Sequence, residues 1–313
     1  MRYLFFLLAL LSCAGTLPSS AQSLVTTIPV SGQPYGVAVN ATNNRIYVNF
    51  STSIGVIDGN TNTVIDTVQT PWQGSFFIAV NFVTGRVYTA GCSNTSACGV
   101  TVMDGSTDAV ITTIPIKNGS GLVPQGIAVN PLTNRIYVAD DLVSRIVEID
   151  GRTNTVLSYI QAYSSKISGL AVDFSSNQIL PVPSDGLLVI NGSSHTVSLV
   201  EAGTLDYDVA ANSFTNRAYV TGSTLSVVDL TSLETIADVP IGSAPFAVCV
   251  DYLSNRVFAT VMGADGSVVE IDGHTNIVTG TLAVRSDYVD VNPITRLVYA
   301  SDTNDSSVHV ISE

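Results

Sequence analysis

The chain has 313 residues, of which 46% are hydrophobic and 12% are charged. This composition excludes an intrinsically disordered chain, and the ordinary glycine and proline contents exclude collagen-like and linker-like classes. Twelve basic residues against 25 acidic ones give a net charge of −13, which repels phosphate backbones, so no nucleic-acid partner is expected.

The amino terminus has the organisation of a secretory signal peptide. Arg2 precedes an apolar run at 4–11, and small residues lead up to Ala21. We predict cleavage after Ala21, which makes residues 1–21 the signal peptide and leaves residues 22–313 as one domain.

A lipid anchor is the alternative fate of this segment. Residues 10–13, Leu-Leu-Ser-Cys, resemble a bacterial lipobox that would attach the protein through Cys13. No later stretch reaches the roughly 18 unbroken apolar residues of a spanning helix. We therefore expect a protein without a transmembrane segment that is secreted, periplasmic or held at the cell surface.

Two short patterns recur along the rest of the chain. The first is an apolar run that ends in Asn or Asp and is followed by an Arg-Ile-Tyr-Val run, as at Asn40 and Arg45. The second is Ile-Asp-Gly-x-Thr-Asn, as at Ile57. The first pattern returns seven times with a mean period of 42 residues, ending at Asn40, Asn81, Asn130, Asp173, Asn212, Asp251 and Asn292.

Each repeat reads as four short β-rich runs separated by Asn, Asp, Gly and Thr turns, with no sustained helical period. Four strands per unit at this period are typical of β-propeller blades. We therefore predict an all-β, seven-bladed propeller with four antiparallel strands in each blade.

The two ends of the chain predict how the ring closes. The last repeat ends after its third strand, near Ile311. Residues 25–30, Val-Thr-Thr-Ile-Pro-Val, nearly repeat residues 111–116, Ile-Thr-Thr-Ile-Pro-Ile, which form a fourth strand. The amino-terminal run is therefore expected to complete the last blade.

Three cysteines remain after signal cleavage. Cys92 and Cys98 flank a polar segment without metal-ligand spacing, and an oxidising compartment favours a disulfide between them. Cys249 lies in an apolar strand and is expected to be a buried free thiol.

Several of these blocks resemble a known repeat family. Tyr-Val-Ala-Asp at Tyr137, Tyr-Val-Thr-Gly at Tyr219 and the Ile-Asp-Gly-x-Thr-Asn blocks are similar to YVTN-family β-propeller repeats over residues 24–313. The resemblance implies a bacterial extracytoplasmic or surface-layer-type propeller with a role in binding. It brings no catalytic motif to this chain.

The repeated charges invite either a structural or a ligand-binding reading. An arginine opens the second strand where an aspartate closes the third, so both lie at the same rim. We expect structural pairs within each blade. They are Arg45 with Asp58, Arg86 with Asp104, Arg135 with Asp150, Arg217 with Asp229 and Arg256 with Asp272, with Gln178 and Asn191 as a neutral replacement.

The opposite rim carries loops of variable length, and function more often lies on such loops. We place the ligand there, with an acidic surface and aromatic contacts that suit a cationic or neutral partner. The candidate residues are Trp72, Asp140, Asp141, Arg145, Tyr207, Arg285, Asp287, Tyr288 and Asp302.

Carboxylates without histidine suit hard cations such as calcium. Asp302, Asn304 and Asp305 are the candidate ligands, and solvated turn aspartates are the alternative because no complete calcium-loop spacing is present. Otherwise no cofactor is expected.

The function that the sequence favours is a non-enzymatic binding or interaction scaffold, acting as a monomer on a protein or cell-envelope ligand. His195, His274 and His309 do not converge, and no hydrolase, zinc-protease or phosphate-loop motif is present. The alternative is a lactonase-like hydrolase with its site at the mouth of the central channel, which rests on analogy of fold alone.

Overall fold

A computed structural model describes residues 22–73, 76–93, 97–116, 124–140, 144–162, 166–184, 186–203, 207–263 and 266–313. The predicted signal peptide, with its cleavage site at Ala21 and the alternative anchor at Cys13, lies outside these residues. The described chain is built from strands that form seven four-stranded sheets. It contains no helix long and apolar enough to cross a membrane.

The first three blades follow the predicted repeats. Blade 1 holds β2 (Val37–Asn40), β3 (Arg45–Asn49), β4 (Ser53–Asp58) and β5 (Thr63–Gln69). Blade 2 holds β6 (Ile78–Asn81), β7 (Arg86–Cys92), β8 (Cys98–Asp104) and β9 (Val110–Ile116). Blade 3 holds β10 (Pro124–Asn130), β11 (Arg135–Asp140), β12 (Arg145–Asp150) and β13 (Thr155–Gln161).

The next three blades repeat this order. Blade 4 holds β14 (Ile167–Asp173), β15 (Gln178–Pro183), β16 (Leu187–Asn191) and β17 (Val197–Val200). Blade 5 holds β18 (Asp208–Asn212), β19 (Arg217–Thr221), β20 (Leu225–Asp229) and β21 (Glu234–Val239). Blade 6 holds β22 (Pro245–Asp251), β23 (Arg256–Val261), β24 (Ser267–Asp272) and β25 (Ile277–Leu282).

Blade 7 contains both ends of the described chain. Its strands are β26 (Tyr288–Asn292), β27 (Leu297–Asp302), β28 (Ser307–Ser312) and the amino-terminal β1 (Ser23–Pro29). β1 pairs antiparallel with β28, with Thr27 opposite His309 and Ile28 opposite Val308. The predicted seven blades and the predicted closure are both confirmed.

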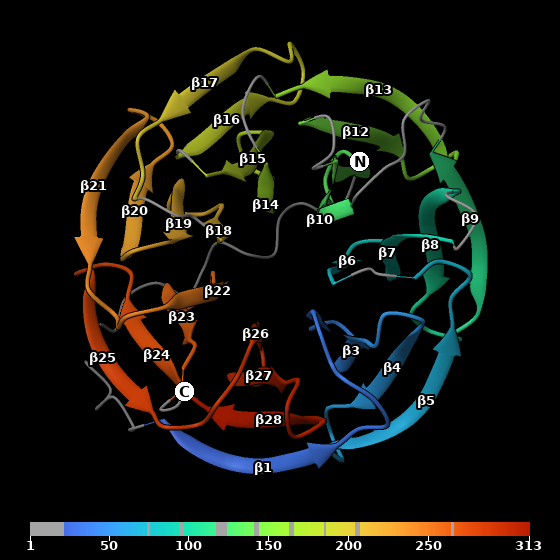
Figure 1. Cartoon of the computed structure of the whole chain (residues 1–313), viewed down its shortest axis with the longest axis horizontal. Coiled ribbons are helices and arrows are strands. Elements are labelled where there is room, and N and C mark those ends of the chain that lie inside the picture. The colour runs from blue at the N-terminus through green and yellow to red at the C-terminus, as the bar shows by residue number, and fades with distance from the viewer. Residues whose placement is uncertain are drawn as a thin grey trace, which may run out of the picture.

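The blades stand around a central axis as in a propeller (Figure 1). The first strand of each repeat lies innermost, and the fourth lies on the circumference, a place that β1 takes in blade 7. Neighbouring blades cover both faces of the inner strands, which is why these strands are apolar at successive positions instead of alternating.

Apolar residues of adjacent blades form the core. The tyrosine of the Arg-x-Tyr run is fully buried in four blades, Tyr299 of blade 7 is buried as well, and Phe258 takes this place in blade 6. The Tyr47 hydroxyl donates a hydrogen bond of 2.8 Å to the carbonyl of Gly105 in the next blade. A Cβ at Gly105 would lie only 2.5 Å from that hydroxyl oxygen, so this close approach between blades requires glycine.

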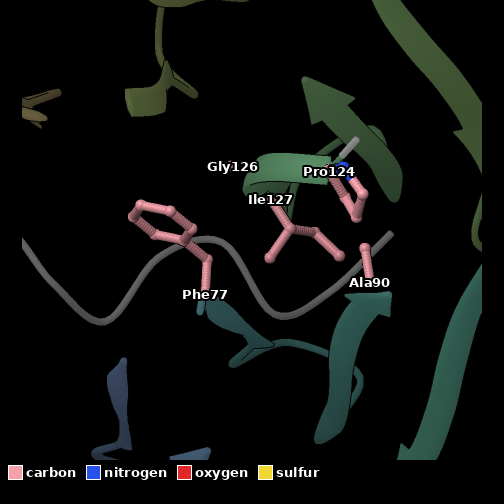
Figure 2. A pocket seen from close by; sticks show the side chains of 5 residues that line it. All are labelled: Phe77, Ala90, Pro124, Gly126 and Ile127. Atoms are coloured by element: carbon pink, nitrogen blue, oxygen red, sulfur yellow. The ribbon is translucent and has the colours of Figure 1, made fainter. Parts of the chain in front are cut away.

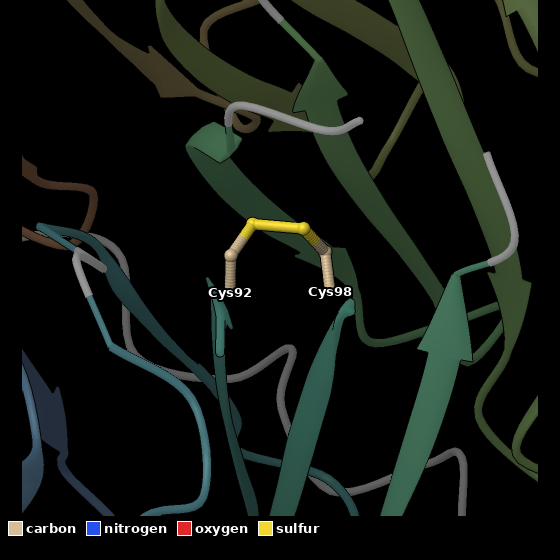
Figure 3. The surroundings of a disulfide bond; sticks show 2 residues. All are labelled: Cys92 and Cys98. Atoms are coloured by element: carbon tan, nitrogen blue, oxygen red, sulfur yellow. A yellow bond between two sulfur atoms is a disulfide. The ribbon is translucent and has the colours of Figure 1, made fainter. Parts of the chain in front are cut away.

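The predicted disulfide between Cys92 and Cys98 is present (Figure 3). The two residues stand opposite each other at the ends of β7 and β8, with their Cα atoms 3.9 Å apart. Cys249 is a buried free cysteine in β22, as predicted, and burial raises the pKa of its thiol well above the ordinary value.

Candidate functional site

The two rims of the ring differ in construction. We call the rim that carries the turns between first and second strands and between third and fourth strands the turn rim. The opposite rim, where second strands connect to third and fourth strands to the next blade, is the loop rim. In the turns between first and second strands, one residue has a positive φ. That residue is an asparagine in five blades, which are Asn44, Asn134, Asn177, Asn216 and Asn255.

The strand register at the turn rim is the predicted one, with each arginine opposite its expected aspartate. Arg135 and Asp150 also form the expected ion pair, at 2.7 Å. Arg45, Arg86 and Arg217 correct the prediction, because their guanidinium groups reach the neighbouring blade. Arg86 donates to the carbonyl of Gly151 at 2.6 Å, and Arg217 donates to the carbonyl of Gly273 at 2.6 Å.

Arg45 follows the same pattern and adds an ion pair between blades. It donates to the Gly105 carbonyl at 3.2 Å and pairs with Asp108 at 2.6 Å. Its expected partner Asp58 instead accepts a hydrogen bond from the backbone N–H of Asn60 in its own turn. Arg256 contacts Glu270 of its own blade. The charges at this rim therefore mostly link blades and cap turns.

Several turn aspartates have a lowered pKa because they accept hydrogen bonds within their own turns. Asp104 accepts from the hydroxyl and the backbone N–H of Ser106, and these hydrogen bonds lower its pKa. Backbone N–H groups of Ser232 and Thr231 lower the pKa of Asp229 in the same way. Such capping explains why each unit carries an acidic or amide residue here without any ligand.

On the loop rim, the structure brings three candidate residues of blade 7 together. Arg285 pairs with Asp302 at 2.5 Å and with Asp287 at 3.3 Å. Both carboxylates are buried, and Asp287 also accepts from the backbone N–H of Thr303. His309 lies 3.8 Å from Asp302. The arginine neutralises these carboxylates and ties the hairpin between β27 and β28 to the segment that leads into β26.

Asp140 and Arg145 form a similar pair in blade 3, while Asp141 lies outside the described residues. Arg145 donates to Asp140 at 3.0 Å and stacks over the ring of Tyr159 at 4.4 Å. Asp140 is fully buried. This arrangement closes the hairpin between β11 and β12 and leaves little of the carboxylate for a ligand.

The candidate metal ligands occupy a single tight turn. Asp302 accepts from the backbone N–H groups of Asn304 and Asp305 at 2.9 and 3.3 Å. Across the described part of the chain, no group of three or more His, Cys, Asp and Glu side chains could hold a metal ion.

The candidate aromatic residues lie in two different places. Trp72 packs on the disulfide hairpin, where a Cβ at Gly99 would lie 2.9 Å from its ring. Tyr207 and Tyr288 belong to a row of rings at the inner edge of the loop rim. Ring centroids are 5.8 Å apart for Tyr207 and Phe246, 5.3 Å for Phe246 and Tyr288, and 5.8 Å for Tyr288 and Phe77.

Phe77 also borders the junction between blades 2 and 3. Figure 2 shows it beside Ile127 and Pro124 of β10, with Ala90 of β7 nearby. The space between these residues has no room for a water molecule. The junction is therefore tightly packed. A separate cavity of about 280 Å³ lies along the central axis.

The three histidines do not meet at that axis. His195 and His274 occupy turns between third and fourth strands, and His309 lies within β28, where its Nδ1 is 3.0 Å from the Thr27 hydroxyl. No histidine lines the central cavity in the part of the chain that the structure describes.

The turn rim carries a feature that the sequence analysis missed. Five of its turns hold a large apolar residue at the second position after the Asn or Asp that ends the innermost strand, and each side chain is at least 61% exposed. We call this set the apolar rim: Val83, Leu132, Phe214, Leu253 and Ile294. The recurrence of these residues at one repeat position was a readable signal.

Further rings extend the apolar rim around the axis. Phe82 and Phe174 have centroids 6.1 Å apart, Phe174 and Phe214 6.2 Å, and Phe214 and Tyr252 5.5 Å. A hollow of about 350 Å³ lies between the turns of blades 6 and 7, with Leu253, Ile294 and Arg296 in its wall. The apolar residues thus form a broad surface with a depression in it.

Comparison with known proteins does not indicate which of these surfaces binds a ligand. No protein-family model and no curated protein matches the chain. What is established is the architecture, a seven-bladed β-propeller with a hairpin disulfide.

Proposed function

We propose that this protein is a non-enzymatic interaction module that binds another protein through the apolar rim. The observation that carries the proposal is the exposure of five large apolar side chains at one repeat position. The turns do not need them, because Thr42 and Ser175 occupy the same position in blades 1 and 4. Exposed apolar surface of this extent is typical of interaction sites.

A protein suits this surface better than the other large partners. The net charge of −13 opposes binding to nucleic acid and to anionic lipid headgroups. Aspartates and arginines both border the apolar residues at this rim, as in the ion pairs of Arg45 with Asp108 and Arg135 with Asp150. We therefore propose a partner with an apolar patch bordered by polar groups of mixed charge.

The proposal includes a family and a compartment. The resemblance to YVTN-type repeats and the signal-like amino terminus support export to the periplasm or the cell surface, and the disulfide is compatible with an oxidising compartment. Binding is favoured over lactonase-like hydrolysis because no described histidine reaches the cavity.

The test uses a photo-crosslinking amino acid in place of Leu253, in cells that export the full chain. We expect one crosslinked protein, mapped by peptide sequencing to contacts at the turn rim. The double variant Phe214→Ser with Ile294→Ser should weaken binding of that protein at least tenfold, because each buried apolar anchor contributes about 1 kcal/mol or more.

A matched control removes exposed apolar side chains elsewhere. Leu199→Ser with Ile236→Ser changes two outer-strand residues that are 55% and 43% exposed, and it should leave binding within twofold. Equal loss from both variants would overturn the proposal. So would a crosslink to a second copy of the chain, or binding to lipid vesicles that the rim variant abolishes.

A further inference from the structure

The central cavity is lined by the innermost strands of all seven blades, from β2 to β26. Its wall is mainly aliphatic, and it includes two carboxylates, those of Asp208 and Asp290. No lysine or arginine is among the described residues of this wall. The cavity therefore contains two acidic groups and no side chain of opposite charge.

Each carboxylate is fixed by the blade that follows it. Asp208 Oδ2 accepts from the backbone N–H of Val248 at 3.1 Å, and Asp290 Oδ2 accepts from the N–H of Val39 at 2.7 Å. These amides lie on the inner edge of an innermost strand, where no further strand is available to pair with them. The hydrogen bonds orient the carboxylates but supply no full positive charge.

The lack of a positive partner affects the pKa of both carboxyl groups. Burial raises the pKa of Asp208 and of Asp290 to about 6. A bound cation would provide the missing counter-charge.

The two carboxylates lie at different depths. Asp208 is four residues before Asn212, and Asp290 is two residues before Asn292. These asparagines hold the same place at the turn rim, and each donates to an asparagine of the next blade. The carboxylates are thus offset by two residues along the axis, or about 7 Å of strand.

Aromatic rings surround the approach to the nearer carboxylate. Asp208 directly follows Tyr207, the first ring of the row that continues through Phe246 and Tyr288 to Phe77. The faces of such rings attract cations. A positively charged molecule that arrives from the loop rim would meet the rings first, Asp208 next and Asp290 last.

We propose that the central cavity binds a linear aliphatic diamine, whose two ammonium groups pair with Asp208 and Asp290 while its methylenes contact the aliphatic wall. The volume of about 280 Å³ suits a small, extended molecule. A calcium ion fits less well, because it gathers six to eight oxygens around one point and these carboxylates are offset. The apolar rim lies on the opposite face, so this proposal stands or falls independently of the protein partner.

The experiment is calorimetric titration of the full exported chain with 1,4-diaminobutane at pH 7.5. We expect saturable binding, with butylamine at least tenfold weaker because it has one charge. Asp208→Asn and Asp290→Asn should each weaken diamine binding at least tenfold. Asp305→Asn makes the same change of charge on an exposed turn and should leave the affinity within twofold.

A measurement on the unaltered protein guards against misfolded variants. Lowering the pH from 7.5 to 5.0 protonates both carboxylates and should weaken diamine binding at least tenfold. The other titratable groups nearby are Cys249 and Tyr288, whose pKa values burial raises, and Asp251 and Glu313 toward the turn rim. A double variant of Asp208 and Asp290 should lose this pH dependence.

Three results would overturn the proposal. They are equal affinity for butylamine and the diamine, unchanged diamine binding in folded Asp208→Asn protein, and an affinity that does not change between pH 7.5 and 5.0. Saturable calcium binding that Asp208→Asn abolishes, without diamine binding, would make the cavity a metal site instead.

Discussion

The asparagine that ends an innermost strand performs two tasks with one side chain. The Asn81 oxygen accepts from the N–H of Val83, which fixes the turn, while its amide donates to Asn134 of the next blade at 2.9 Å. The turn task is readable from sequence, because Asn and Asp favour such turns. The second task is not, because a repeat pattern does not say which side chain of the next blade will face it.

The cavity carboxylates lead to a prediction about stability. A carboxylate with a raised pKa holds its proton more tightly in the folded than in the unfolded chain. Its contribution therefore favours folding at low pH and is lost as the pH rises from about 4 to about 6. Asp290→Asn should be more stable than the parent protein at pH 7.5, by about 2 kcal/mol, and similar to it at pH 4.

Urea unfolding at the two pH values measures this difference. Asp104 and Asp229 have lowered pKa values, so the stability that they contribute is lost at acid pH, but both proteins share them and their effect cancels in the comparison. Asp305→Asn serves as the control and should show no gain at pH 7.5. A variant that is less stable than the parent at both pH values would show that the carboxylate is a needed acceptor and not an uncompensated charge.

At the scale of strands and blades, sequence alone predicted the pairing within a blade better than the contacts between blades. Arg217 stands opposite Asp229 as expected, yet its guanidinium bonds to Gly273 of blade 6. Gln178 also reaches the next blade, because its amide donates to the carbonyl of Leu230 in blade 5 at 3.4 Å. A long side chain can reach beyond its own sheet, and its destination depends on the spacing between sheets.

A double-mutant cycle tests whether Arg45 pairs with the neighbouring blade or with its own blade. Arg45→Met and Asp108→Asn, tested singly and together, should show a coupling of about 1 kcal/mol because the two side chains are an ion pair between blades. The same cycle for Arg45 and Asp58 should give a coupling near zero, although the two residues face each other in the sheet. Chemical denaturation measures the free energy of unfolding of each variant. A larger coupling for Asp58 than for Asp108 would show that Arg45 pairs mainly within its own blade.

For the whole molecule, the number of blades and the closure followed from the repeat, because a fixed period and a missing fourth strand leave few ways to complete a ring. The contacts of the candidate site residues did not follow. Arg285 and Asp302, 17 residues apart, were candidates for a ligand and turned out to bond to each other. A single exposed apolar residue such as Leu132 does not indicate a surface by itself. The apolar rim is recognised only when the ring brings the equivalent residues of five turns together.

The closure itself gives a prediction for the whole ring. A chain that begins at Ser31 lacks β1 and leaves the edge of β28 unpaired. We expect its melting temperature to fall by more than about 10 °C, together with a tendency to associate through the open edge. Calorimetry against a chain that begins at Gln22 is the measurement, and a difference of a degree or two would show that β1 contributes only local contacts.

The pairing of β1 with β28 also sets an order of events during synthesis. Ser23 bonds to Ser312 across 289 positions, so this contact forms only after all seven repeats have been synthesised. Six blades can be completed from neighbouring segments as they emerge, since each is a run of consecutive hairpins. Blade 7 cannot. The time between synthesis of the first strand and arrival of its partner is therefore the longest wait in the folding of this protein, and for that interval the nascent molecule is an open arc with a free strand at its leading end.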